Sequence, residues 1–458
     1  MFFKSKATPS IVVDLLNKLG ISMCFRWCSD AVRSHGISER ESLRRFILSG
    51  GRPLVIYDNI RLQFQKATQR VNNQTHGDNG TSATIVFLPE SIYEPLRNYH
   101  QLYAAKMIEN QANGHDGYPR LTFEDFVNRE ELDYIQQHYV YQVIKVLLDT
   151  PAFDDYKFKD SPELQPPPPI YHLPTGRAHR TRYSMLGTWP IEEATYDGNL
   201  LVLDEILKGL FGKLTDETEA KVGSGGIPGD QVTYTRDQHL LQLRSQDGNA
   251  FDRLSWMIPG FGWFHAQLNL GYSVLANHRG THSSFGLSRD IAQIGIKGLA
   301  SDEDKPNFHT VDALLLTECV ARFRALWLWV TESSSLNFEL KAKFDFDSES
   351  SAVEIRRLAT SIVNKRASSS AIAILEGFGA QNNDPVLRQS ILLNTDLLLY
   401  TQLRETIREG DVGHLEYLVP SLAMYYKGAG KPNYARLMID YLQWSKYEAP
   451  PGIRYGSV

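Results

Sequence analysis

The sequence predicts an α/β protein in which a small sheet core is interrupted and followed by a large helical region. Two short apolar runs rich in β-forming residues, 53–57 and 84–88, end at polar or turn residues, which favours buried strands. From about residue 306 onward, apolar residues recur at i, i+3 and i+4, which predicts helices. With 42% hydrophobic and 22% charged residues, the chain is neither disordered, collagen-like nor a coiled coil.

The length and the charge limit the number of domains and the kinds of partner. A chain of 458 residues suggests two to four domains, or one domain that carries a large insertion. The net charge of −5 argues against a protein that holds nucleic acid by bulk charge. However, residues 1–70 carry 12 Lys and Arg against 5 Asp and Glu. We therefore expect any DNA contact near the start of the chain, weak and salt-dependent, with Arg44 and Arg45 among its residues.

Residues 1–50 are predicted to form an N-terminal helical hairpin. Pro9-Ser10 begins an amphipathic helix that Gly20 closes, and a second helix follows over roughly 23–35. This pattern resembles a DNA-reading helix-turn-helix, but it is generic, so plain packing is the alternative.

Residues 51–150 are predicted to form the first part of the α/β core, and residues 151–198 a Pro-rich linker. The first strand is expected to stop at Asp58-Asn59; the other expected elements are a polar loop at 72–82, the strand at 84–88, and helices at 91–110 and 130–149. Pro166 to Pro169 are typical of a surface-laid segment, so 151–190 and the polar run 345–351 are expected to be less ordered.

Residues 199–305 are predicted to complete the α/β core, and residues 306–458 to form the helical region. A helix at 199–213 is followed by a Gly-rich turn before Asp230, and an aromatic stretch precedes a helix that begins at His265. The later helices are predicted at 311–331, 352–377, 386–409, 412–427 and 432–446.

Cysteine usage and the lack of apolar stretches predict an intracellular protein without a membrane span. Cys24, Cys28 and Cys319 make neither a disulfide framework nor a zinc motif. The first residues lack the apolar run of a signal peptide, and no stretch reaches the length of a membrane helix.

Three residues are candidates for a site. An aspartate at a strand end holds a carboxylate rigidly, as a divalent metal shared with a phosphate requires, and Asp58 and Asp230 fit this description. The alternative is that both cap turns. His265 is either a polar group directed at the same site or a buried or capping histidine. Hydrolase-triad, zincin and dinucleotide-binding motifs are absent from the sequence.

Several segments together resemble a known family. They are Tyr57-Asp58-Asn59-Ile60, Asn79-Gly80-Thr81, Ile191 to Asn199, Gly229-Asp230-Gln231-Val232-Thr233, Asn249 to Leu254, Gly262-Trp263-Phe264-His265, Ile407 to Gly413 and Gly428 to Ala435. In their order and spacing, the chain resembles the domain-of-unknown-function family 6589, fungal proteins similar to transposases with a ribonuclease-H-like core. The likeness covers about residues 10–450.

The resemblance implies a ribonuclease-H-like mixed sheet core with a large helical insertion and a mostly helical C-terminal half. It also implies a nuclear protein that cleaves and joins DNA with Mg²⁺ or Mn²⁺ held by Asp58, Asp230 and a third acid, and with His265 orienting a carboxylate or the phosphate. Glu318, Glu405 and Asp411 are the candidates for the third acid. Self-association is a further expectation.

The chain departs from the family pattern before Asp230. Residues 221–228 contain a Pro and many Gly, so the strand expected there is predicted to be eroded. We therefore expect a degenerate or truncated transposase relative. The alternative is a catalytically inactive helical protein that binds a partner or acts as a scaffold.

Overall fold

The chain divides into two units, which are described separately. The computed structural model describes residues 8–51, 53–64, 76–89, 98–211, 225–281, 283–296, 298–299, 306–336, 338–377 and 384–450. The sheet unit comprises 1–112, 175–262 and 450–458, and the helical unit comprises 113–174 and 263–449. Each unit is therefore built from segments that are far apart in the sequence. The domain boundaries expected from the sequence stay a prediction.

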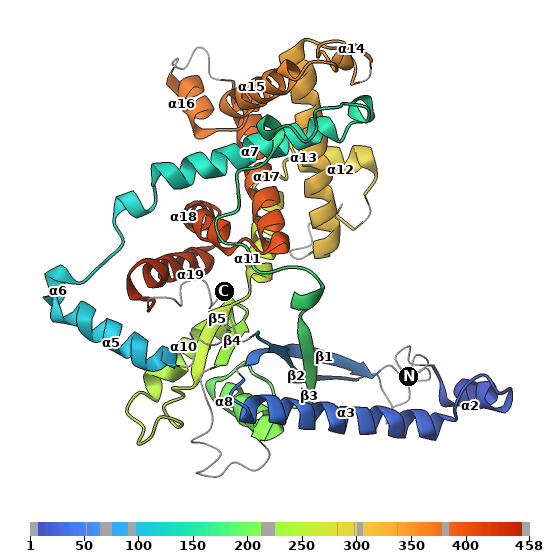
Figure 1. Cartoon of the computed structure of the whole chain (residues 1–458), viewed down its shortest axis with the longest axis vertical. Helices are drawn as coiled ribbons and strands as arrows, with labels where there is room; N and C mark the ends of the chain where they lie inside the picture. The colour runs from blue at the N-terminus through green and yellow to red at the C-terminus, as the bar shows by residue number, and fades with distance from the viewer. Residues whose placement is uncertain are drawn as a thin grey trace. The chain divides into compact units, whose positions relative to one another are not determined.

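The sheet unit contains a five-stranded mixed sheet with the order β3-β2-β1-β4-β5 (Figure 1). Its strands are β1 (Pro53–Phe64), β2 (His76–Phe87), β3 (Arg182–Trp189), β4 (Gly225–Gly229) and β5 (Met257–Phe261). β1, β2 and β3 pair antiparallel, whereas β4 runs parallel to β1, and β5 parallel to β4. The expected α/β class with a mixed sheet is confirmed.

The hairpin of β1 and β2 is longer than the sequence predicts. β1 does not stop at Asp58-Asn59 but continues to Phe64, and the polar residues 76–82 are part of β2 rather than of a loop. Asp58 pairs with Ser82, and Arg61 pairs with Asn79. The expected boundaries were wrong because cross-strand pairing extends both strands through residues of low β propensity. Residues 65–75 lie outside the described part of the chain.

The short segment before Asp230 is a central strand, contrary to the expectation of an eroded one. β4 lies between β1 and β5 although its sequence is Gly-Gly-Ile-Pro-Gly. A Cβ atom at Gly226 would lie 2.8 Å from Leu54 Cδ1, so glycine permits the close approach of β4 to β1. Gly225 N donates to Trp256 O and Gly262 N donates to Gly229 O, each at 2.8 Å. Residues 221–224 of the predicted segment are outside the described residues.

The predicted linker also contains structure. Residues 182–189 form β3, and short 3-10 turns within 151–164 bury Phe153, Tyr156 and Leu164. Pro166 to Pro169, on which the expected linker rested, form neither helix nor strand. The packed residues on either side were not predicted, because isolated aromatic and aliphatic side chains give no helical or strand periodicity. The expectation that 151–190 is less ordered than its neighbours stays a prediction, which hydrogen exchange would test.

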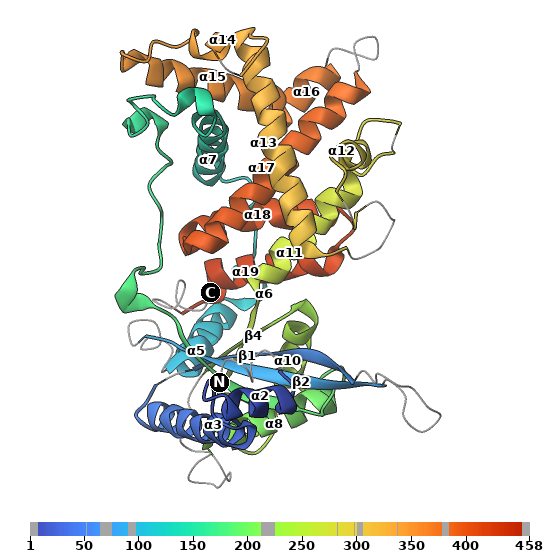
Figure 2. The ribbon, with the colours of Figure 1, turned by 90° about the vertical axis from the view of Figure 1, so that its right-hand side faces the viewer.

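Two helices cover one face of the sheet (Figures 1 and 2). They are α3 (Phe25–Leu48) and α8 (Tyr196–Phe211), and they share a hydrophobic core with β1, β2 and β4. α2 (Ser10–Lys18) precedes α3, as the predicted hairpin requires, but α3 extends well beyond residue 35. The other long helices of this unit are α5 (Tyr99–Ala112) and α10 (Gln231–Leu243).

Most helices of the helical unit lie where the apolar spacing of the sequence predicts them. Its helices are α6 (Gly114–Gly117), α7 (Arg129–Leu148), α11 (Trp263–Asn277), α12 (Leu287–Ile294), α13 (Phe308–Thr331), α14 (Phe338–Lys341), α15 (Ser350–Arg366), α16 (Ser369–Gly377), α17 (Pro385–Glu409), α18 (Val412–Gly428) and α19 (Pro432–Gln443), with a π-helical turn η7 (Trp444–Glu448). The predicted helix 352–377 is two helices, because Ala367 leaves helical geometry at φ −151° and ψ 44°.

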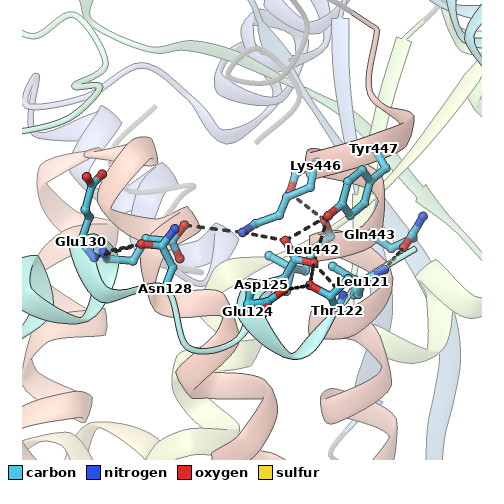
Figure 3. Close-up of polar contacts among 12 residues, drawn as sticks. Leu121, Thr122, Glu124, Asp125, Asn128, Glu130, Leu442, Gln443, Lys446 and Tyr447 are labelled. Carbon is cyan, nitrogen blue, oxygen red and sulfur yellow. Dashed lines mark hydrogen bonds and ion pairs between the residues drawn. The ribbon is translucent and has the colours of Figure 1, made fainter. Parts of the chain in front are cut away.

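A polar network joins two distant segments of the helical unit (Figure 3). The Asp125 carboxylate accepts hydrogen bonds from Thr122 N at 2.7 Å and from the Tyr447 hydroxyl at 3.0 Å, and it pairs with Lys446 at 3.3 Å. Burial favours a higher pKa for Asp125, but these hydrogen bonds outweigh it and lower the pKa. The Asp125 carboxylate is therefore fixed in its charged form by these partners.

No helix within the described ranges is long and apolar enough to cross a membrane. Cys24, Cys28 and Cys319 are free thiols, as expected.

Candidate functional site: a carboxylate cluster beside β1 and β4

The two aspartates predicted from the sequence belong to neighbouring central strands. β1 and β4 run parallel with Leu54 opposite Gly226. Asp58 lies four residues beyond Leu54, and Asp230 lies four residues beyond Gly226. Equal offsets in a parallel register bring the two residues to the same level of the sheet. Asp58 is on β1 itself, and Asp230 directly follows β4.

A third carboxylate, Glu193, lies beside this pair. It precedes α8, and its side chain is only 2% exposed. Its Oε1 accepts hydrogen bonds from Asn59 Nδ2 at 3.0 Å and from Thr233 Oγ1 at 3.2 Å. Asn59 and Thr233 are close neighbours in sequence of Asp58 and Asp230, so Glu193 is held between the segments that carry the two aspartates. Its other oxygen, Oε2, is buried and makes no hydrogen bond with any described residue.

The negative charges of Asp58 and Asp230 act on Glu193. Burial raises the pKa of Glu193 most strongly, and the negative charges of Asp58 and Asp230 raise it further. A hydrogen bond from Thr233 and the positive charge of Arg236 act in the opposite direction. The resulting pKa is about 7. Glu193 therefore changes charge near neutral pH, as acids in functional sites often do.

A buried network lies next to the cluster. The Tyr57 hydroxyl is 2.5 Å from Asn199 Oδ1 and 3.1 Å from Asp237 Oδ1, and Asn199 Nδ2 donates to Asp237 Oδ1 at 3.3 Å. Burial, the largest cause, and the charge of Glu193 raise the pKa of Asp237 to about 7. These contacts fix β1, α8 and α10 to one another around Glu193.

Each predicted aspartate also has a local structural role. Asp230 Oδ1 accepts a hydrogen bond from Thr233 N at 2.7 Å and so caps the N-terminus of α10. Asp58 is exposed, and its Oδ1 accepts a hydrogen bond from Asn59 N at 2.7 Å. Asp230 therefore makes the contact expected of a cap, whereas Asp58 is inside β1 and caps no turn.

His265 and the candidates for a third acid belong to the helical unit. His265 is in the first turn of α11, where its carbonyl accepts a hydrogen bond from Asn269 Nδ2 at 3.0 Å. Each candidate acid has a partner in that unit: Glu318 pairs with Arg322, Glu405 with Lys145, and Asp411 caps α18. None of these residues is part of the sheet unit that carries Asp58 and Asp230.

The two arginines predicted to contact DNA follow one another on α3. Arg45 is exposed and donates from Nε to the Glu41 carbonyl at 3.4 Å. Arg44 is half-buried, and its Nε is buried without a hydrogen bond to a described residue. Their role in binding stays a prediction.

Sequence reasoning missed Glu193 and Asp237. The segment Ile191 to Asn199 contributed to the resemblance, but no local motif distinguishes Glu193 from the exposed Glu192 beside it. Asp237 is in the middle of a helix, without metal-ligand spacing to another acid. Only the folded chain brings both residues to β1.

The acids of this site have the chemistry of a divalent-cation site but not a closed coordination group. Carboxylate oxygens are the ligands that Mg²⁺ and Mn²⁺ prefer. Among the described residues, however, no group of three or more His, Cys, Asp and Glu is arranged so that it could hold a metal ion.

The fold and this cluster define an α/β protein with a buried carboxylate beside two parallel central strands. The chain belongs to the family of unknown function DUF6589, whose model matches residues 117–456. The matched residues include Glu193, Asp230 and Asp237, whereas Asp58 precedes them. No curated protein and no solved structure matches the chain.

Proposed function

We propose that this chain is a transposon-derived nuclear protein of fungal origin whose sheet unit is a degenerate relative of the ribonuclease-H-like core of DNA transposases. The observation that carries the proposal is that Asp58 and Asp230 share one level of two adjacent parallel strands, and that the buried Glu193 is hydrogen-bonded to Asn59 and Thr233, which neighbour them in sequence. Asp58 and Asp230 agree with the resemblance, in which the first acid ends strand one and the second follows strand four. Glu193 departs from it, because the family's third acid lies on a late helix and Glu193 precedes Asp230 in the chain. The third acid of this proposal is Glu193, which replaces Glu318, Glu405 and Asp411.

The chemistry of the acids, rather than their arrangement, supports a divalent cation. Glu193 Oε2 is a buried carboxylate oxygen without a hydrogen-bond partner among the described residues, and it lies beside two further acids. A bound Mg²⁺ or Mn²⁺ would supply positive charge that stabilises a phosphodiester undergoing cleavage. Glu193 would be the ligand, and Asp58 and Asp230 would add negative charge nearby without closing a coordination group around the ion. Asn59 and Thr233 orient Glu193, and Asp230 stays fixed by its bond from Thr233 N.

Cation binding at this site depends on whether Glu193 is protonated. Near pH 7 the carboxyl group is about half protonated, since its pKa is about 7. A cation that neutralises Asp58 and Asp230 removes the repulsion that raises this pKa, so cation binding releases the proton. Because the acids are not gathered in a closed group, an ion would stay mostly hydrated.

Manganese is expected to stabilise the protein only slightly. A fivefold excess of Mn²⁺ over its Kd should add about 1 kcal/mol and raise the melting temperature by a few degrees, since stabilisation follows RT ln(1 + [L]/Kd). Asp58→Asn and Glu193→Gln should each abolish this increase in a thermal melt of the full chain. Glu192→Gln, which removes an exposed acid next to Glu193, is the matched control and should keep it. An increase that survives both site variants argues against the cluster as the metal site.

Cleavage is tested separately with end-labelled DNA and Mn²⁺. The proposal predicts slow strand cleavage that Asp58→Asn and Glu193→Gln abolish and Glu192→Gln retains. Cleavage that does not depend on Asp58 would contradict the assignment.

The second candidate function is an inactive helical binding or scaffold protein. Its supporting observation is that acids of this chain have structural roles. Asp230 caps α10, and Asp125 forms an ion pair with Lys446. This candidate predicts no Mn²⁺-dependent stabilisation and no cleavage.

A further inference from the structure

A basic segment leads into the edge strand of the sheet. Arg177, His179, Arg180 and Arg182 fall within 175–189, a stretch that contains no Asp or Glu. All four side chains are exposed. Such a local excess of positive charge attracts polyanions even though the whole chain is acidic.

Exposed apolar side chains continue this basic segment along β3. Tyr183 is 69% exposed and Met185 is 70% exposed. Tyr183 pairs with Val86, and Met185 pairs with Thr84, which in turn pairs with Ile56. Ile56 is 40% exposed. We call Ile56, Tyr183 and Met185, together with Arg177, His179 and Arg180, the β3 face; Arg182 alternates to the other side of β3.

The β3 face extends towards the carboxylate cluster. Side chains alternate along a strand, so Asp58 is on the same side of β1 as Ile56. The opposite side carries the core residues Val55 and Tyr57, which are buried. The Tyr183 ring and Asp58 are therefore on the same side of the sheet, and Arg177 and Arg180 are in the segment that leads into its edge strand, whereas Glu193 bonds to Asn59 on the other side of β1.

The backbone of β3 is held firmly. Arg40 Nη2 on α3 donates to the Leu186 carbonyl at 3.2 Å. Arg182 lies over the ring of its cross-strand neighbour Phe87, with Cζ 5.2 Å from the centroid. The exposed side chains consequently project from a fixed strand, which lowers the entropy lost when a ligand binds.

We propose that the β3 face binds single-stranded nucleic acid, with Arg177 and Arg180 contacting phosphates and Tyr183 stacking on an unpaired base. Guanidinium groups bind phosphate oxygens in paired hydrogen bonds, and a free aromatic face stacks on bases of any sequence. Bases inside a duplex are already stacked, so the exposed ring favours single strands. The inference names the substrate class of the carboxylate cluster and in this respect rests on the proposed function.

The test is fluorescence anisotropy of the full chain with a labelled 20-nucleotide single strand in EDTA. Two phosphate contacts predict roughly sevenfold weaker binding at 200 mM than at 50 mM salt. Arg177→Glu/Arg180→Glu should weaken binding at least tenfold and flatten the salt dependence. Tyr183→Ala should weaken it about five- to tenfold, and Tyr183→Phe, which keeps the ring, should bind like wild type. Circular dichroism checks that each variant is folded.

The comparison variant is Arg44→Glu/Arg45→Glu on α3, where the sequence places the DNA contact. The inference requires this variant to keep most of its affinity. It is overturned if only the α3 variant loses binding, if Tyr183→Ala binds like wild type, or if a duplex of the same sequence binds more tightly than the single strand. DNA and RNA strands of the same sequence identify which nucleic acid is preferred.

The binding test and the cleavage test can fail independently of each other, so the two proposals are tested separately. Binding in EDTA without cleavage in Mn²⁺ supports the β3 face and contradicts a catalytic role of the cluster. Cleavage that depends on Asp58 but is unchanged by the Arg177/Arg180 and Tyr183 variants supports the cluster and overturns the β3 face.

Discussion

Asp411→Ala is expected to destabilise the helical unit by about 3 kcal/mol. The carboxylate is 4% exposed and accepts three backbone hydrogen bonds, from Ile170 N at 3.3 Å, Tyr171 N at 3.1 Å and His414 N at 3.2 Å. Its removal leaves three amide groups without their acceptor, and each unsatisfied buried group costs about 1 kcal/mol or more. Urea unfolding followed by circular dichroism measures the loss.

The matched control is Asp384→Ala. Asp384 also caps a helix, α17, by accepting from Val386 N and Leu387 N, but it is exposed. An exposed N-cap contributes about 1 kcal/mol. Equal losses for the two variants would contradict the view that Asp411 anchors the segment 170–173, and a loss below about 1 kcal/mol for Asp411→Ala would have the same meaning.

The second large effect is a pH-dependent gain from Asp237→Asn. Asp237 is fully buried, and its pKa is raised from the ordinary carboxyl value to about 7, mainly by burial. The folded state therefore binds the proton more tightly than the unfolded state, so the stabilising contribution is complete below about pH 4 and is lost as pH rises through 7. Asparagine imitates the protonated acid at every pH.

We expect Asp237→Asn to be close to neutral at pH 4.5 and to stabilise the protein by about 3 kcal/mol at pH 8, since each pKa unit is equivalent to 1.36 kcal/mol. Urea unfolding at both pH values measures the difference from wild type. Asp197→Asn, at an exposed site on α8, should change stability by less than about 0.5 kcal/mol at either pH. A constant difference between wild type and Asp237→Asn across this range would show that Asp237 titrates normally.

The helices were predictable because each carries its own signal. The stretch 386–409 was predicted from i, i+3, i+4 spacing, and α17 spans Pro385–Glu409 with Asp384 as its cap. The periodicity arises from one buried face and needs no knowledge of the partner. The break between α15 and α16 at Ala367 was not predictable, because the apolar spacing continues through it.

The sheet was less predictable because pairing partners, rather than local propensity, define its strands. β4 has the composition of a turn, and its pairing with β1 and β5, rather than its own residues, makes it a strand. The site shows the same division. Asp58 and Asp230 were candidates from strand and turn patterns, whereas Glu193 was not, since its partners Asn59 and Thr233 come from segments distant in sequence.

The sheet can be completed only late in biosynthesis, because its strands come from separate parts of the chain. β1 and β2 leave the ribosome early, but β4, which pairs with Leu54, is made only when Gly226 has been translated, after residues 113–174 of the other unit. Until then one edge of the β1–β2 hairpin has no partner strand, and unpaired edges promote association between chains. Formation of this sheet is therefore a slow, late step, since contacts between distant residues form slowly. Nascent chains stalled before residue 225 should bind chaperones more strongly than chains released after residue 262.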